Sequence, residues 1–114
     1  MGYPVVHFEI HATDDGATQQ FYADLFGWKV DNNNPMNYGM IDTQADGQGI
    51  AGGVMSKREA SGLTFYVQVP DPQAILDRAV AKGSTVVMPV SEMGPVTMAV
   101  FTDPAGNHIG VVKG

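Results

Sequence analysis

The sequence predicts an α+β fold made of two βαβββ modules. Their strands would form a curved eight-stranded mixed sheet around a central cleft, with the helices on the outer faces. Two observations favour this fold. Alternating runs typical of strands, and helical runs, recur in the same order in both halves of the 114 residues. Three pairs of identical residues are also related by one shift of 57 positions: Phe8 and Phe65, Asp14 and Asp71, and Gly53 and Gly110. Such a repeat indicates two similar modules in a single domain, residues 1–114.

The first module is expected at about residues 4–57. Residues 4–12 alternate as a strand does, with one apolar face and one polar face carrying His7, Glu9 and His11. A helix follows, because Asp14 is among three N-cap candidates and Gly27 is a typical C-terminal cap. Its apolar residues recur at helical spacing, at Phe21, Tyr22, Leu25 and Phe26. Three short strands are predicted next, at about 28–31, 37–43 and 49–56.

The second module is expected at about residues 62–113 and repeats this order. Residues 63–69 alternate, and Asp71 caps a helix with Pro72 at its first position. Strands follow at about 84–90, 95–102 and 107–113, and the D-P-A-G segment before the last one is a type I turn. A ferredoxin-like order has two strands between its helices, whereas four are counted here, so that fold is set aside.

Composition and charge argue against several classes of protein. Twelve acidic and six basic residues give a net charge of −6, which argues against nucleic-acid binding, because phosphates require Lys and Arg. The chain has no cysteine, so disulfides and thiolate metal sites are excluded and a cytoplasmic location is expected. Neither a signal peptide nor a membrane-spanning run is expected. The acidic balance suits a cationic ligand.

Polar residues on the first strand of each module predict where a ligand binds. The side chains expected on the inner face of the sheet are His7, Glu9, Thr64, Tyr66 and Gln68. Burying such groups without partners is costly, whereas lining a water-filled cleft with them is not. Clefts of this kind bind small molecules. The sequence therefore predicts a small-molecule site between the modules.

Several motifs resemble those of the vicinal oxygen chelate superfamily, the group of glyoxalase I, extradiol dioxygenases, fosfomycin resistance proteins and bleomycin resistance proteins. The motifs are F-Y-A-D-L-F-G-W at 21–28, G-G-V at 52–54 and D-P-A-G-N-H-I-G-V at 103–111. The resemblance extends from about Pro4 to Val112 and implies the doubled βαβββ fold. It implies little about the substrate, because one fold hosts many functions.

In metal-using members of this superfamily, four inner-face side chains hold one divalent ion. The resemblance puts these four places at His7, Gly53, Thr64 and Gly110. Only the histidine is kept, and one histidine does not hold an ion that needs three or four ligands. We therefore expect no metal and no cofactor. The two glycines would leave room for a ligand, and the alternative is a β-bulge or a tight backbone crossing at each of them.

Nine residues are candidates for ligand binding: His7, Glu9, Tyr38, Gly53, Met55, Thr64, Tyr66, Met98 and Gly110. Two of them, Glu9 and His7, are also candidate catalytic groups, because a half-buried carboxylate or an imidazole can act as a general base. The alternatives are a salt-bridged or rim carboxylate for Glu9, and for His7 a cavity histidine satisfied by a neighbour or water. The other histidines, His11 and His108, are expected to be exposed near strand ends.

Three kinds of function are left open by these residues. The first is a metal-independent protein that binds a small molecule. The second is a lyase, isomerase or dioxygenase-type enzyme of the same superfamily, using Glu9, His7 or a displaced divalent metal site. The third is a non-catalytic module that only dimerises. A homodimer is expected, because exposed sheet edges favour pairing, and neither nucleic acid nor a membrane is expected as a partner.

Overall fold

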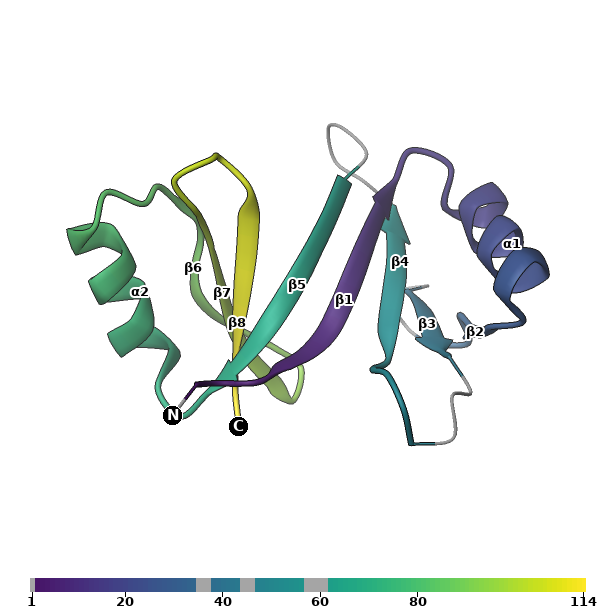
Figure 1. The fold of residues 1–114 in the computed structure, drawn as a ribbon, viewed down its shortest axis with the longest axis horizontal. Helices are drawn as coiled ribbons and strands as arrows, with labels where there is room; N and C mark the ends of the chain where they lie inside the picture. Colours follow the sequence, from purple (N-terminus) through teal and green to yellow (C-terminus); the bar gives the residue numbers. More distant parts are fainter. Residues whose placement is uncertain (1, 35–37, 44–46, 57–61) are drawn as a thin grey trace. The chain divides into compact units, whose positions relative to one another are not determined.

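A computed structural model describes residues 2–34, 38–43, 47–56 and 62–114. The contacts divide the chain into two compact units. The N-terminal unit is His7–Leu63, and the C-terminal unit combines Thr64–Gly114 with Met1–Val6. Each unit contains one helix, as Figure 1 shows. Each unit also has its own cluster of buried apolar residues.

The N-terminal half of the fold has the strand order β2-β3-β4-β1. Its elements are β1 (Val5–Ala12), α1 (Asp15–Phe26), β2 (Lys29–Asp31), β3 (Gly39–Asp42) and β4 (Gly52–Ser56). β1 and β4 are parallel, while β3 is antiparallel to both β2 and β4. The strands expected at 37–43 and 49–56 are shorter than predicted, and residue 37 lies outside the described residues.

The C-terminal half repeats this pattern with the strand order β5-β8-β7-β6. Its elements are β5 (Gly62–Val69), α2 (Pro72–Ala81), β6 (Val86–Met93), β7 (Val96–Thr102) and β8 (His108–Lys113). β5 and β8 are parallel, and β7 is antiparallel to both β8 and β6. The predicted α+β class is therefore confirmed, with βαβββ occurring twice and with mixed parallel and antiparallel pairing.

The helix ends follow the predicted capping residues. The side chain of Asp14 accepts a hydrogen bond from the backbone N–H of Ala17 at 3.0 Å, which satisfies a donor at the start of α1. Gly27 ends α1 with a φ of 71°, a left-handed conformation that glycine adopts without strain. Asp71 caps α2 in the same way, through the N–H of Ala74 at 3.2 Å.

Each unit has its own apolar core beneath its helix. In the N-terminal unit the buried residues are Ile10, Ala12, Ile41 and Val54, and the aromatic rings of Phe8, Tyr22 and Trp28 pack against them. In the C-terminal unit they are Val69, Leu76, Ala99 and Val111. None of the helices in the described residues is long and apolar enough to span a membrane.

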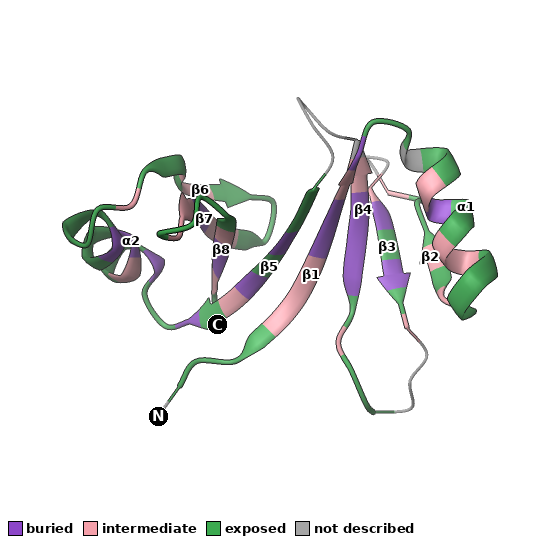
Figure 2. Cartoon of the chain, turned by 45° about the horizontal axis from the view of Figure 1, so that its top comes forward, coloured by how far each residue is buried: buried purple, intermediate pink, exposed green. Residues whose placement is uncertain are grey.

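The apolar stripe predicted for α1 is only partly buried. Phe21, Leu25 and Phe26 are more than half exposed, and of the four predicted residues only Tyr22 packs against the core. The helix buries Gln19 instead, whose side-chain oxygen accepts a hydrogen bond from Asn32 at 2.9 Å. Most of α1 is accordingly drawn as exposed in Figure 2. The helix predicted from the spacing of these residues is confirmed, but a polar residue, Gln19, takes a buried position on it while most of them stay exposed.

Candidate functional site

The polar face of β1 is where the structure gathers candidate site residues of the N-terminal unit. Phe8, Ile10 and Ala12 point into the core, so the alternate residues His7, Glu9 and His11 lie on the opposite face of the strand. Glu9 is only 8% exposed, which is unusual for a carboxylate unless it has hydrogen-bonding partners.

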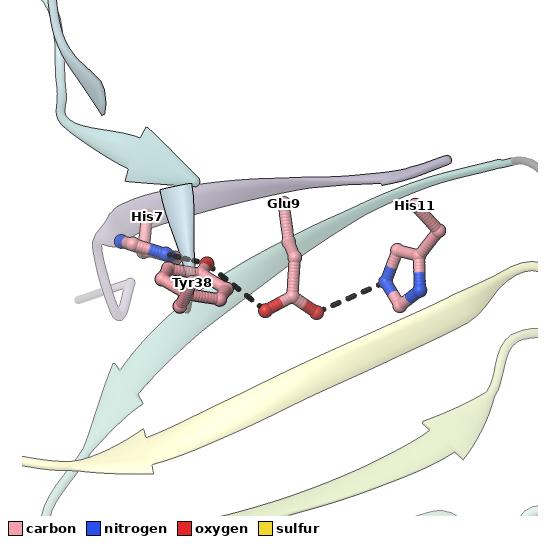
Figure 3. Close-up of polar contacts among 4 residues, drawn as sticks. All are labelled: His7, Glu9, His11 and Tyr38. Atoms are coloured by element: carbon pink, nitrogen blue, oxygen red, sulfur yellow. Dashed lines mark hydrogen bonds and ion pairs between the residues drawn. The ribbon is translucent and has the colours of Figure 1, made fainter. Parts of the chain in front are cut away.

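Tyr38 supplies one of these partners. It directly precedes β3, and its hydroxyl donates a hydrogen bond to Oε2 of Glu9 at 3.0 Å. The same hydroxyl oxygen lies 3.0 Å from Nε2 of His7. A phenol from another part of the unit thus stands between a histidine and a carboxylate of β1 (Figure 3).

The backbone of Tyr38 is held from both sides by one asparagine. The side-chain amide of Asn34 donates to the carbonyl oxygen of Tyr38 at 2.7 Å, and its side-chain oxygen accepts from the Tyr38 N–H at 2.9 Å. These paired hydrogen bonds fix the point from which the ring extends. The position of the hydroxyl is therefore determined by local structure as well as by its contacts with β1.

The opposite oxygen of Glu9 contacts His11. Nε2 of His11 lies 2.9 Å from Oε1 of Glu9, and the His11 side chain is only 14% exposed. The expectation that His11 is exposed near a strand end was therefore wrong: the alternation that directs Glu9 to this face also directs His11 there. His108 is exposed, as predicted. Glu9 is buried rather than at a rim, and its contact with His11 is the salt bridge that one alternative held when the His11 ring is protonated.

Gly53 explains how the Tyr38 ring fits against the sheet. It pairs with Glu9 in the β1–β4 register, and a Cβ atom placed on it would fall on the Tyr38 ring. The ladder runs through Gly53 without a register shift in either pairing, so the bulge alternative is wrong here. The room left by the missing side chain is filled by the tyrosine of this same unit.

Burial also sets the charge of His7. The surrounding protein desolvates the ring and lowers the pKa of His7 below its usual 6.5, while the negative charge of Glu9 partly opposes this effect. His7 is therefore neutral at neutral pH. It combines with a carboxylate, a phenol and a second imidazole in one hydrogen-bonded array that can bind polar groups or exchange protons.

The candidates in the C-terminal unit form a set of their own. Thr64 and Tyr66 are buried on β5, at 8% and 5% exposure, and Tyr66 pairs with Gly110 of β8. A Cβ atom on Gly110 would meet the Tyr66 ring, and the ladder is again continuous. Met98 pairs with Val112, and in the N-terminal unit Met55 pairs with His11.

A divalent metal does not fit the residues around His7. Its Nε2 atom faces the Tyr38 hydroxyl, and the place of a side chain at position 53 is taken by the same ring. Across residues 2–34, 38–43, 47–56 and 62–114, no group of three or more His, Cys, Asp or Glu residues is arranged to hold a metal ion. No residue in these ranges is therefore assigned as a metal ligand.

Comparisons of this chain with a family model and with known proteins agree on one family. A family model described as a glyoxalase-like domain matches residues 7–112. The chain is 31% identical over 111 residues to a Mycobacterium tuberculosis protein named "Putative glyoxylase CFP32", with 90% of this chain and 42% of that protein covered. It is 33% identical over 108 residues to a glyoxylase-like domain-containing protein of Didymella fabae, with 87% and 84% covered. The chain thus spans less than half the length of the mycobacterial relative.

Solved structures share the fold at low sequence identity. A glyoxalase/bleomycin resistance protein/dioxygenase superfamily member from Vibrio splendidus has a TM-score of 0.68 and 19% identity, over 99% of this chain and all of that one. Methylmalonyl-CoA epimerase from Mycobacterium tuberculosis has a TM-score of 0.68 and 15% identity, over 96% and 86% of the two chains. The family match covers nearly the whole sequence, and the doubled βαβββ order agrees with it. This chain therefore belongs to the glyoxalase-like domain family, within the vicinal oxygen chelate superfamily.

Proposed function

We propose that this domain binds a small organic molecule without a divalent metal ion, on the face of the N-terminal unit formed by His7, Glu9, His11 and Tyr38. The observation that carries the proposal is the position of the Tyr38 hydroxyl, 3.0 Å from both the His7 nitrogen and the Glu9 carboxylate. His7 is the one ligand position of the superfamily's metal site that this chain keeps, and the hydroxyl contacts its ring nitrogen. The lack of carboxylate side chains at Gly53 and Gly110 supports the same reading.

The chemistry of this face favours a ligand with a positive charge or with hydrogen-bond donors. Glu9 brings a carboxylate, and the Tyr38 ring offers an aromatic surface beside it. Cations bind both to carboxylates and to aromatic faces. The net charge of −6 adds a weak attraction for such ligands. The lack of cysteine supports a cytoplasmic location for the protein.

A second candidate is an enzyme of the lyase or isomerase class. In that case Glu9 acts as a general base and takes a proton from the bound substrate. The neutral His7 can exchange a proton with Tyr38, whose hydroxyl it contacts. Two observations support this candidate: the carboxylate is buried and hydrogen-bonded rather than in solvent, and the structural relatives include a protein named as an epimerase. Enzymes often place such groups where burial alters their protonation.

Thermal unfolding with and without metals tests the proposal. The protein is treated with a chelator, dialysed, and screened against quaternary ammonium compounds and aromatic amines. We expect at least one probe to raise the melting temperature of the metal-free protein, since a ligand at 100 times its Kd adds about 2.7 kcal/mol. Glu9→Gln should lose the shift, whereas Glu92→Gln on exposed β6 should keep it. Stabilisation that appears only after Zn²⁺, Ni²⁺ or Mn²⁺ is added would contradict metal independence.

A further inference from the structure

The hydrogen-bonding pattern around Tyr38 supports an inference about how this face is organised. We infer that Tyr38 is a positioning residue: its hydroxyl holds His7 in the Nε2–H tautomer and orients the Glu9 carboxylate, and position 53 is a glycine because this ring occupies its space. The inference deepens the proposed function. The hydrogen bonding of Tyr38 stands without that function, whereas its effect on ligand binding rests on it.

The direction of the two hydrogen bonds follows from the atoms involved. A phenol carries one hydrogen, and a carboxylate only accepts, so the Tyr38 hydroxyl donates its hydrogen to Oε2 of Glu9. The hydroxyl oxygen can then only accept at its second contact. Nε2 of His7, 3.0 Å away, must therefore be the donor and carry a hydrogen. The lowered pKa of His7 is consistent with a neutral ring, whose Nδ1 is then an acceptor.

The fit of the ring against the sheet depends on the absence of a side chain at position 53. A Cβ atom there would fall on the Tyr38 ring, so any other residue must displace it. The two hydrogen bonds between the Asn34 side chain and the Tyr38 backbone limit how far the ring can retreat. A residue larger than glycine would therefore separate the hydroxyl from His7 and Glu9.

The neighbouring Gly52 provides a matched comparison on the other face of the same strand. A Cβ atom there would lie 2.5 Å from the ring of Phe8, which packs against the apolar core. An alanine at either glycine thus forces an aromatic ring to move. Only the change at Gly53 should affect the hydrogen bonds of His7, because only that ring carries the hydroxyl that His7 contacts.

Long-range ¹H–¹⁵N correlation spectra of the imidazole rings test the tautomer directly. Spectra are recorded at about pH 8, where histidine is neutral. We expect the Nε2–H pattern for His7 in the natural protein and a mixture of tautomers in Tyr38→Phe, which keeps the ring but loses the hydroxyl. Tyr22→Phe, which removes a hydroxyl from a ring packed against the core, should leave the His7 pattern unchanged. An Nδ1–H pattern in the natural protein, or an unchanged pattern in Tyr38→Phe, would overturn the inference.

Two alanine substitutions test the role of the glycine. Gly53→Ala should give the same His7 spectrum as Tyr38→Phe although it retains the hydroxyl, whereas Gly52→Ala should keep the natural pattern. Equal effects of the two alanines on His7 would contradict the inference. Should Gly53→Ala fail to fold, Tyr38→Ala combined with Gly53→Ala removes the clash and should restore folding. Where both single variants fold, their losses in melting temperature are compared with the loss in the double variant. A double-variant loss equal to the sum of the two would show that positions 38 and 53 are not coupled and would contradict the inference.

The ligand screen separates this inference from the proposed function. A protein that binds none of the ammonium or amine probes, yet shows the Nε2–H pattern and its loss in Tyr38→Phe, contradicts the proposed function alone. A protein that binds a probe but shows the Nδ1–H pattern contradicts the inference alone. If both hold, Tyr38→Phe should weaken probe binding about tenfold or more, because the Glu9 carboxylate loses the hydrogen bond that orients it.

Discussion

The side chains of Tyr38 and Glu9 meet at 3.0 Å although 29 positions separate them in the sequence. The contact crosses Gly53, which pairs with Glu9 and lies under the tyrosine ring. One glycine on β4 therefore permits a phenol next to β3 to reach across β4 to a buried carboxylate on β1. Tyr38 thus joins the polar face of β1 from outside the strand, and the alternation of residues within β1 does not indicate this contact.

Replacing Glu9 by Gln should destabilise the fold. The carboxylate accepts from the Tyr38 hydroxyl and faces Nε2 of His11, whereas a glutamine presents an NH₂ group to one of them. A hydrogen bond to a buried charged group contributes about 1.5–3 kcal/mol, so we expect a loss of that order in urea unfolding. Glu92→Gln, on an exposed part of β6, should change stability by less than about 0.5 kcal/mol. Similar losses in both variants would contradict the burial argument.

The stability of the fold should decrease as the pH falls below the usual histidine range. Burial lowers the pKa of His7 from 6.5, so the unfolded chain binds a proton at pH values where the folded protein does not. The contribution is present above about pH 6.5 and is lost as the pH falls toward the folded-state pKa. Unfolding in urea at about pH 7.5 and 5.5 measures this difference.

His7→Gln should make this pH dependence shallower, because it removes the buried titrating ring. His108→Gln, at an exposed position, should retain the slope of the natural protein. Asp103, whose pKa is lowered mainly by its hydrogen bonds with Asn107, acts only in a more acidic range and does not interfere. An unchanged slope in His7→Gln would show that His7 is not the group responsible.

Removing the cap of α1 should weaken the N-terminal unit. Asp14 accepts a hydrogen bond from the N–H of Ala17, and replacement of such a cap by alanine costs about 0.5–2 kcal/mol. Asp24→Ala, which loses only an exposed contact with Gln20 on the same helix, should cost less than about 0.5 kcal/mol. Chemical denaturation of both variants compares the two losses. Equal losses would mean that Asp14 does not act as a cap.

The protein is expected to form a homodimer. Phe21, Leu25 and Phe26 lie more than half exposed on α1. Exposed apolar side chains that form a large patch often mark a contact between proteins. Light scattering at tens of micromolar should therefore give about twice the chain mass of 12.1 kDa. A mass near that of one chain across this range would contradict the expectation.

Local sequence patterns predicted much of the fold, because its elements have local causes. The alternation of residues 4–12 put His7 and Glu9 on one face, and the structure confirms that placement. Asp14, Asp71 and Gly27 act as the caps that the sequence indicated. The shift of 57 positions also identified Gly53 and Gly110 as equivalent, and each lies under a tyrosine ring.

Contacts between distant residues could not be predicted in this way. Nothing near Tyr38 in the sequence indicates that its ring lies over Gly53, since that contact depends on how β3 and β4 pair. His11 was expected to be exposed because it is near a strand end. It lies instead on the same face of β1 as Glu9, whose carboxylate its ring nitrogen contacts. The helical spacing of Phe21 and Leu25 indicates that they lie on the same side of α1. It does not indicate whether that side faces the core or the solvent.

The most direct test of metal-independent binding is a Zn²⁺ titration followed through the imidazole resonances of His7. At neutral pH, with the protein purified without added metal, one equivalent of Zn²⁺ should leave the Nε2–H signals of His7 in place, because the Tyr38 hydroxyl already occupies that nitrogen. Loss of the Nε2 hydrogen and a shift of the His7 resonances, saturating at one Zn²⁺ per chain, would show that His7 is a metal ligand and would contradict the account.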